Sequence, residues 1–133
     1  MATQSVSEDL YELAKGFLLH LNDKPEAAPY LAAYDMRVQF DVRDGSSFYA
    51  VLRDGKVQSV EPGRFENFSN RDDIELFGQE DGFRLIFEKR TTPATAMYYG
   101  KVTPKGERGK HCQAALTYTL LRIGQEPDWI GDL

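Results

Sequence analysis

Cysteine and histidine are scarce in this 133-residue sequence. Cys112 is the single cysteine, which excludes an internal disulfide and a zinc knuckle made from cysteine pairs. The two histidines, His20 and His111, have no cysteine, serine or acid at the spacing of a catalytic or metal-binding motif. We therefore expect no catalytic residues, no metal and no cofactor. An enzyme stays as a third alternative, because a catalytic triad is assembled in space rather than in sequence.

Basic residues are also fewer than acidic ones: 16 lysines and arginines against 21 aspartates and glutamates give a net charge of −5. Nucleic-acid binding without sequence preference needs a basic face, so no nucleic-acid partner is expected. The local exception is a basic run that consists of four residues: Lys101, Lys105, Arg108 and Lys110. These side chains either keep an edge strand from aggregating or contact the anionic headgroups of a membrane surface.

Long apolar runs are missing too, since no stretch approaches the roughly 20 residues that a membrane-spanning helix needs. The first residues lack the basic-then-apolar layout of a signal peptide, so we expect a cytoplasmic protein. Neither "GKVTPKGERGK" nor the twice-occurring "RDG" has the spacing of a phosphate-binding loop. The length suits one domain, residues 1–133.

What is present begins with an amphipathic helix. Ser5 and Glu8 have the spacing of a capping box, which marks a helix start. The apolar residues that follow recur at helical spacing and define one stripe: Leu10, Leu13, Ala14, Phe17, Leu18 and Leu21. The alanine-rich residues 25–34, interrupted by a proline, predict only a short helical turn.

The hydrophobic period then changes to two, which predicts strands. Apolar and polar residues alternate over 36–43, with Gln39 in the polar set and one face buried. The Asp-Gly dipeptides at 44–45 and 54–55 are typical of hairpin turns. We predict three strands of an antiparallel meander: 36–43, 47–53 and 56–61.

A loop and two further elements follow the meander. Residues 62–71 form a loop long enough to be functional, and it carries Phe65 and Phe68. Residues 73–77 predict a fourth strand. Residues 79–90 predict a helix, because acids in its first turn and bases in its last suit the helix dipole. Three apolar residues form its inner face: Phe83, Ile86 and Phe87.

The segment "TTPATAMYYGKVTPKG", residues 91–106, predicts a short helix, a glycine stop and a strand. Thr92 is suited to cap the helix and Gly100 to end it. Pro104 cannot donate a ladder hydrogen bond, so its strand belongs at a sheet edge. One face of the helix carries three residues: Ala94, Met97 and Tyr98.

A final helix follows the basic run and is predicted to end at Gly124. Five residues form its expected apolar face: Cys112, Leu116, Thr119, Leu120 and Ile123. The order of elements predicts an α+β domain with helices on one face of an antiparallel sheet. Composition and periodicity lead no further than this class of domain with an apolar interior.

Three stretches have an order of residues that is known from one family: "VQFDVRDGSSFYAVLRDGKV", "DIELFGQEDGFRLIF" and "TPATAMYYGKVTPKG". They resemble the sterol carrier protein 2-like family, the sterol transfer domains, over about residues 36–123. Six residues fall on the pattern of the third stretch: Pro93, Ala96, Gly100, Lys101, Lys105 and Gly106. Two positions depart from it, because Met97 replaces an aromatic residue and Pro104 replaces a strand isoleucine.

The resemblance implies a five-stranded, mainly antiparallel sheet, with helices on one face and an apolar tunnel between the two layers. A protein of this kind binds and transfers an apolar lipid (sterol-like, fatty-acyl or isoprenoid) without catalysis. The loop with Phe65 and Phe68 and the tail with Trp129 are candidate gates. The candidate ligand-binding residues are the expected inward positions: Phe40, Phe48, Phe83, Ile86, Phe87, Met97, Tyr98, Leu116 and Leu120.

A second hypothesis keeps this fold but not an open tunnel. The phase of the strand 47–53 places Tyr49 and Val51 on the face opposite Phe48 and its neighbours, so both faces of the strand are apolar. This pattern indicates that the outer face is covered. It favours a protein-interaction module or a homodimer with a collapsed tunnel.

Overall fold

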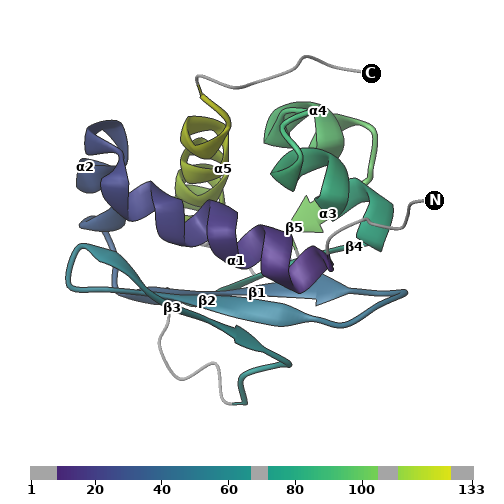
Figure 1. The fold of residues 1–133 in the computed structure, drawn as a ribbon, viewed down its shortest axis with the longest axis horizontal. Helices are drawn as coiled ribbons and strands as arrows, with labels where there is room; N and C mark the ends of the chain where they lie inside the picture. Colours follow the sequence, from purple (N-terminus) through teal and green to yellow (C-terminus); the bar gives the residue numbers. More distant parts are fainter. Residues whose placement is uncertain (1–8, 67–71, 105–110, 127–133) are drawn as a thin grey trace.

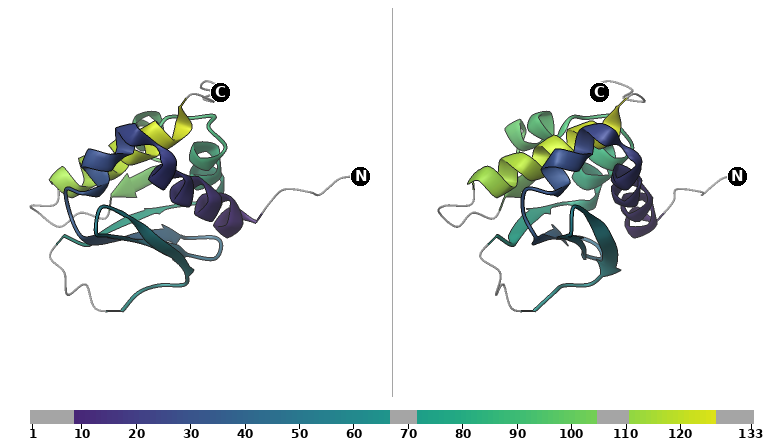
Figure 2. Two further views of the ribbon diagram at one scale, coloured as in Figure 1. Left: turned by 60° about the vertical axis from the view of Figure 1, so that its left-hand side comes forward. Right: turned by 90° about the vertical axis from the view of Figure 1, so that its left-hand side faces the viewer.

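Helices cover one face of a five-stranded sheet in the computed structural model, which describes residues 9–66, 72–104 and 111–126 (Figure 1). The turned views place the helices on the same side of the sheet (Figure 2). The strands are β1 (Met36–Val42), β2 (Phe48–Arg53), β3 (Lys56–Pro62), β4 (Ile74–Gly78) and β5 (Val102–Pro104). The helices are α1 (Leu10–His20), α2 (Ala28–Leu31), α3 (Glu80–Phe87), α4 (Pro93–Tyr98) and α5 (His111–Gln125). Two short 3-10 turns, Leu21–Asp23 and Pro25–Ala27, join α1 to α2.

The strand order is β3-β2-β1-β4-β5. The meander β1-β2-β3 is antiparallel, with Phe40 opposite Phe48 and Ala50 opposite Val60. β4 joins the other side of β1 in parallel, and β5 pairs with β4 in the antiparallel sense. The predicted α+β class, mainly antiparallel sheet and one-sided helical layer are confirmed. β5 lies at the sheet edge, as its proline requires.

The second Asp-Gly dipeptide makes the hairpin turn that the sequence predicts. Asp54 and Gly55 adopt φ values of 56° and 77°, which is the left-handed pair of a type I′ turn. That turn connects β2 directly to β3 and fixes their register. A local irregularity lies in β2 just before the turn, between Val51 and Leu52, where the pairing with β3 shifts.

The helix α1 buries the predicted apolar stripe against the sheet. Leu10, Ala14, Phe17 and Leu18 are buried, while Leu13 is only partly covered. The capping box expected at residues 5–8 lies outside the described residues. The helix begins at Leu10, and Asp9 before it makes no side-chain cap.

The helix α4 has the local chemistry that its sequence predicts. The Thr92 hydroxyl accepts a hydrogen bond from the Thr95 amide at 3.2 Å, which caps the first turn. Gly100 has φ 73° and ends the helix, and the Lys101 amide then donates to the Ala96 carbonyl at 2.8 Å. The chain is thereby turned directly from α4 into β5.

The helix α5 differs from its prediction in the face that it buries. Cys112 is exposed rather than part of the apolar face, and the helix continues past Gly124 to Gln125. The buried positions follow the heptad-like spacing of an inner helical face: Gln113, Leu116, Thr117, Leu120, Leu121, Gly124 and Gln125. Cys112 lies one position before this face, which explains its exposure.

Candidate functional site

A cluster of phenylalanines fills the space between the sheet and the helices. Phe40 of β1 stacks on Phe48 of β2, with ring centroids 5.0 Å apart. Phe83 and Phe87 of α3 meet the Phe40 ring edge-on, at 5.9 and 5.8 Å. All four side chains are buried. The aromatic cluster is therefore the apolar centre of the space between the sheet and the helices.

A groove leads from the surface toward this aromatic cluster. It has a volume of about 320 Å³ and lies where α1 approaches α3 and α5. Its lining includes Phe17 and Phe87, whose rings pack edge-on with their centroids 5.1 Å apart. Phe87 also contacts Phe40 and Phe48. The groove floor is thus continuous with the buried aromatic cluster.

Two glycines shape the groove. A methyl group added at Gly124 would lie 2.5 Å from the Phe17 ring, so α1 and α5 can approach this closely only without a side chain there. Gly16 also lines the groove, and no atom of the described residues lies within 4 Å of the place where its Cβ would stand. Gly124 therefore allows the close contact between α5 and α1, and Gly16 leaves space in the groove.

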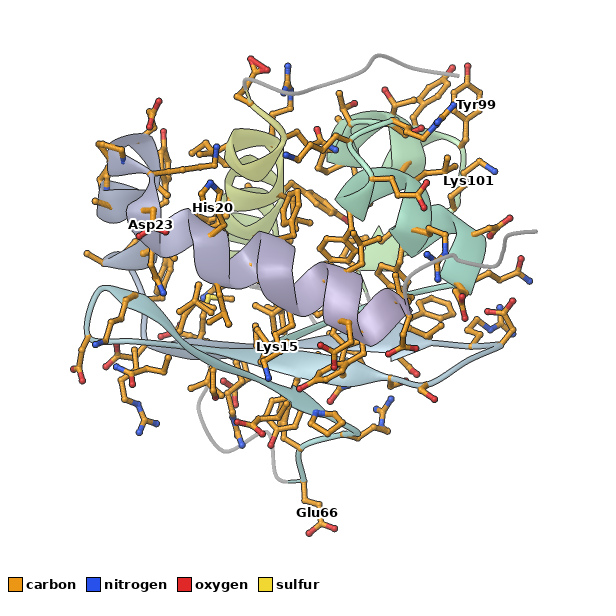
Figure 3. All side chains as sticks on the ribbon, in the orientation of Figure 1. Lys15, His20, Asp23, Glu66, Tyr99 and Lys101 are labelled. Atoms are coloured by element: carbon orange, nitrogen blue, oxygen red, sulfur yellow. The ribbon has the colours of Figure 1, made fainter. Side chains whose placement is uncertain are left out.

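The rim of the groove is polar. Glu12, His20 and Lys89 line it beside the apolar residues. His20 Nδ1 lies 3.5 Å from the Asp23 carboxylate, and both side chains are largely exposed (Figure 3). Among the described residues, no three metal-ligating side chains are grouped closely enough to hold an ion.

The structure separates the predicted ligand-binding residues into two groups. Seven are buried in one continuous core: Phe40, Phe48, Phe83, Ile86, Phe87, Leu116 and Leu120. The other two are surface residues, since Met97 is 42% and Tyr98 81% exposed. Their expected inward position is wrong, because the short α4 turns Pro93 and Ala96 inward instead.

Sequence reasoning missed the glycine pair and assigned Phe17 only to the core stripe. The available signal was the presence of Gly16 and Gly124 inside helices, where glycine costs about 1 kcal/mol relative to alanine. Of the candidate gates, Phe68 and Trp129 lie outside the described residues. Phe65 is buried on the opposite face of the sheet from the helices, where it packs against Tyr49 and Arg37.

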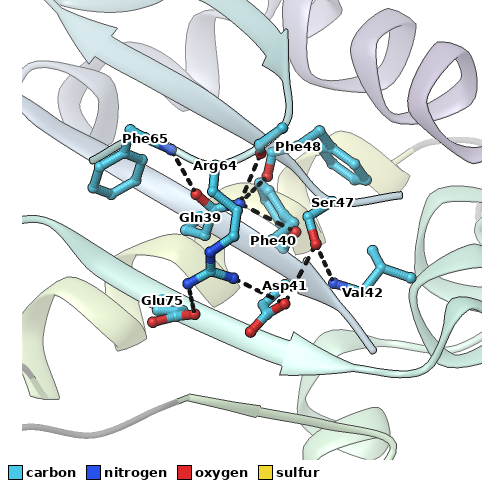
Figure 4. A network of polar contacts seen from close by, with 10 residues as sticks. Gln39, Phe40, Asp41, Val42, Ser47, Phe48, Arg64, Phe65 and Glu75 are labelled. Carbon is cyan, nitrogen blue, oxygen red and sulfur yellow. Dashed lines mark hydrogen bonds and ion pairs between the residues drawn. The ribbon is translucent and has the colours of Figure 1, made fainter. Parts of the chain in front are cut away.

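Part of the outer face of the sheet is covered by the residues that follow β3, which we call the strap, residues 63–66; Figure 4 shows Arg64 and Phe65 of the strap beside Gln39. The Phe65 ring packs edge-on against Tyr49 at 5.3 Å, and the Arg37 guanidinium lies 4.1 Å from its centroid. Glu66 lies below the sheet in Figure 3, on the side away from the helices. The cover that Tyr49 and Val51 led us to expect is thus at least partly supplied by this chain itself.

Gln39 attaches the strap to the sheet. Its Nε2 donates to the carbonyls of Phe48 and Gly63 at 3.0 and 3.1 Å, and its Oε1 accepts from the Phe65 amide at 3.1 Å (Figure 4). The side chain is fully buried. Its assignment to the polar face of β1 was correct, but that face is not solvated at this point.

Ion pairs hold the strap and the start of β4 in place. Arg64 contacts Asp41 at 2.9 Å and Glu75 at 2.7 Å (Figure 4). Burial raises the pKa of Asp41, but hydrogen bonds with Glu75 and Arg64 and the charge of Arg64 lower it more, so the net pKa lies below its ordinary value. The buried Asp73 accepts from the Arg37 amide at 2.7 Å and from its guanidinium at 2.6 Å.

The helix α5 carries buried polar atoms that have no hydrogen-bond partner among the described residues. The Tyr118 hydroxyl is one of them, and burial raises the pKa of Tyr118 to about 12. Gln125 donates to the carbonyls of Ile86 and Thr91, while no group in the described part of the chain donates to its Oε1. These atoms lie on the helix that, with α1 and α3, borders the groove.

Comparison with solved structures shows which fold this is. A possible sterol carrier protein from Thermus thermophilus matches with a TM-score of 0.63 and 15% identity, over 95% of this chain and 94% of that one. A crystal structure of sterol carrier protein 2 matches with a TM-score of 0.64 and 16% identity, over 90% of this chain and 96% of that one. The chain has the sterol carrier protein fold. The sterol carrier protein domain 2 of Helicoverpa armigera also matches, with a TM-score of 0.59 and 13% identity over 92% of this chain and 95% of that one.

The likeness rests on structure, because no family model and no curated protein matches the sequence. The resemblance of the three stretches is therefore confirmed at the level of the sterol carrier protein fold. None of the described helices combines the length and the apolar character needed to cross a bilayer.

Proposed function

We propose that this protein binds an apolar lipid between its helical layer and its sheet and carries it through water without a catalytic step. The ligand class is sterol-like, fatty-acyl or isoprenoid. The observation that carries the proposal is the groove over Phe17 and Phe87, since its floor continues into the buried aromatic cluster. The sterol carrier protein fold supports the same function.

The groove and the core make up the proposed tunnel. A volume of about 320 Å³ is at the lower end for a ligand site, so a whole lipid requires α1 to move away from α5. Phe17 is the side chain best placed to yield, because it lines the groove, contacts Phe87 and packs directly against Gly124 of α5. Burial of apolar ligand surface, at about 25 cal/mol per Å², would supply the affinity.

The seven buried candidates form the proposed lining once the groove has opened: Phe40, Phe48, Phe83, Ile86, Phe87, Leu116 and Leu120. Transfer through contact with an anionic membrane surface belongs to the same proposal. Of the basic run that we expect to make this contact, Lys101 lies within the described residues, and its side chain is exposed.

The experiment begins with the purified protein, which is extracted with organic solvent so that bound lipid can be identified by mass spectrometry. Fluorescent sterol and fluorescent fatty acid are then titrated into the delipidated protein. We expect binding of at least one probe at micromolar concentration. No co-purifying lipid together with no binding of either probe would show the proposal to be wrong.

A pair of variants at one position tests the groove itself. Gly16→Phe should fill the groove, because the space around that position is open, and lower the affinity at least tenfold. Gly16→Ala adds only one methyl group and should change the affinity less than twofold. Equal binding by the two variants would place the ligand elsewhere.

A further inference from the structure

One side-chain oxygen at the C-terminal end of α5 is buried without a hydrogen-bond donor. The Gln125 side chain is fully buried, and none of the described residues donates to its Oε1. A buried acceptor that lacks a donor lowers the stability of a folded protein, so such an atom calls for an explanation. We looked for that explanation in the neighbouring groove.

The nitrogen of the same amide has a structural role. Nε2 of Gln125 donates to the carbonyls of Ile86 and Thr91, at 3.1 and 2.8 Å. These residues come before and after Lys89, which has a φ of 66° that is uncommon for a residue other than glycine. The nitrogen therefore braces the corner that follows α3. Two carbonyls need donors only, so the amide oxygen takes no part in this brace.

The two hydrogen bonds also determine which atom of the amide is unsatisfied. Turning the amide by 180° would place Oε1 of Gln125 against two carbonyl oxygens, none of which can donate. Oε1 is thus held in place as an acceptor. It can be satisfied only by an O–H or N–H group, and an ether or ester oxygen cannot supply one.

Gln125 adjoins the groove on two sides. The preceding residue, Gly124, lines the groove and contacts Phe17. Phe87 and Lys89, which also line it, belong to the segment that Gln125 braces. The side chain therefore lies between the two segments that form this wall. A ligand that displaces Phe17, as the proposed function requires, would enter beside it.

Other buried polar atoms of α5 define a ligand less narrowly. The Tyr118 hydroxyl also has no partner among the described residues, but it lies seven residues earlier, about 10 Å along the helix axis from Gln125. A hydroxyl can rotate and can either donate or accept, so it accommodates several chemistries. The braced oxygen of Gln125 accommodates a donor only.

We propose that Gln125 selects, among apolar lipids, those whose polar end donates a hydrogen bond, such as a primary alcohol or an N-alkyl amide. This inference rests on the proposed lipid site. The head group donates to Oε1, while the hydrocarbon part of the ligand contacts Phe17, Phe87 and the aromatic cluster. The methyl ether of the same lipid has no donor, and its oxygen would face Oε1 as a second acceptor.

The test compares 1-hexadecanol with its methyl ether, which share one hydrocarbon chain and differ in the head-group donor. Each lipid is used to displace whichever fluorescent probe the delipidated full chain binds. We expect the alcohol to bind at least tenfold more tightly than the ether, because a site that hydrogen-bonds a hydroxyl rejects the analogue without one. Gln125→Met, which has a similar shape but no amide, should lower this ratio below threefold.

Two control variants should keep the full ratio. Gln58→Met replaces an exposed glutamine of β3, and Tyr118→Phe removes the other buried hydroxyl of α5. A loss of the brace alone would weaken both lipids together, so an unchanged ratio in Gln125→Met would overturn the proposal. A ratio that falls in Tyr118→Phe instead would overturn it as well.

The unaltered protein decides the matter even if Gln125→Met does not fold. Equal affinities for the alcohol and the ether, or an alcohol that displaces no probe, would show the inference to be wrong, and a buried water on Oε1 would then account for that atom. In either case a bound probe leaves the proposed function standing. Failure of both fluorescent probes to bind would refute the proposed function and this inference with it.

Discussion

The side chain of Gln39 holds the backbone of Phe65 against the sheet, with its Oε1 3.1 Å from the Phe65 amide nitrogen. The same side chain donates to the carbonyls of Phe48 and Gly63 and, at 3.5 Å, to that of Phe40, so one fully buried glutamine satisfies one backbone donor and three acceptors. The strap is therefore attached through β1, the strand at the middle of the sheet.

Removal of the hydrogen bonds between Gln39 and the strap should lower the stability of the protein. Gln39→Leu leaves the Phe65 amide and the Gly63 carbonyl without their partner, and we expect the free energy of unfolding to fall by about 2 to 4 kcal/mol. Urea denaturation measures the loss. Gln58→Leu is the control, because Gln58 is exposed and makes one side-chain bond to the Arg53 carbonyl. A similar small change in both variants would contradict the assigned role.

The contact between Gly78 and β5 gives a second prediction. Gly78→Ala would place a Cβ 2.3 Å from the Lys101 carbonyl, so β5 must shift, and we expect a loss of about 1 to 3 kcal/mol. Gly16→Ala should instead stabilise the protein by about 1 kcal/mol, because alanine favours a helix and nothing lies in its way. Thermal melting should thus move in opposite directions for the two substitutions.

The ion pair between Arg64 of the strap and Asp41 predicts that the stability of the protein depends on pH. A carboxyl with a lowered pKa adds stability above its ordinary value, 3.8 for Asp41, and loses it as the pH falls through the lower folded value. We expect a loss below about 1 kcal/mol, since Arg64 is half exposed and screened by solvent. Urea midpoints between pH 6 and pH 3 measure it.

Arg64→Ala should flatten this acid dependence, and Arg53→Ala, which removes an exposed arginine elsewhere in the sheet, should not. An Arg64→Ala protein with the full dependence of the unaltered chain would show that the pair with Asp41 does not cause it.

The buried hydroxyl of Tyr118 gives a last prediction. Tyr118→Phe removes a polar group that has no hydrogen bond within residues 9–66, 72–104 and 111–126, so the ligand-free protein should gain about 1 kcal/mol in stability. The same burial raises the pKa of Tyr118 to about 12, so the variant should lack the last phenolate step in an ultraviolet pH titration. A loss of stability on substitution would mean that the hydroxyl has a partner in solution.

The sequence predicts best the elements that depend on neighbouring residues. The type I′ turn at Asp54 and Gly55 and the Thr92 cap are chosen by local backbone chemistry, and both are found. The alternating pattern of β1 places Phe40 inward for the same reason. The resemblance of the third stretch to a known family pointed to the right fold but not to the orientation of each side chain.

The predictions that were wrong or absent concern residues whose positions depend on contacts between segments far apart in the sequence. Met97 and Tyr98 are outward because α4 is too short to bury a second turn. Gln39 is buried because the strap crosses the outer face, which no periodicity within β1 can reveal. The groove depends on Gly124 meeting Phe17 of another helix, a contact that single-helix patterns do not contain.

The parallel pairing of β1 with β4 has a consequence for how the chain folds. β1, β2 and β3 pair through short connections, so this hairpin meander can form quickly. β4 can pair only when Val38 meets Ile74, after the whole meander and strap have been traversed. We expect the closure of that long loop to limit the folding rate, so mutations in β4 that weaken its pairing with β1 should mainly slow folding.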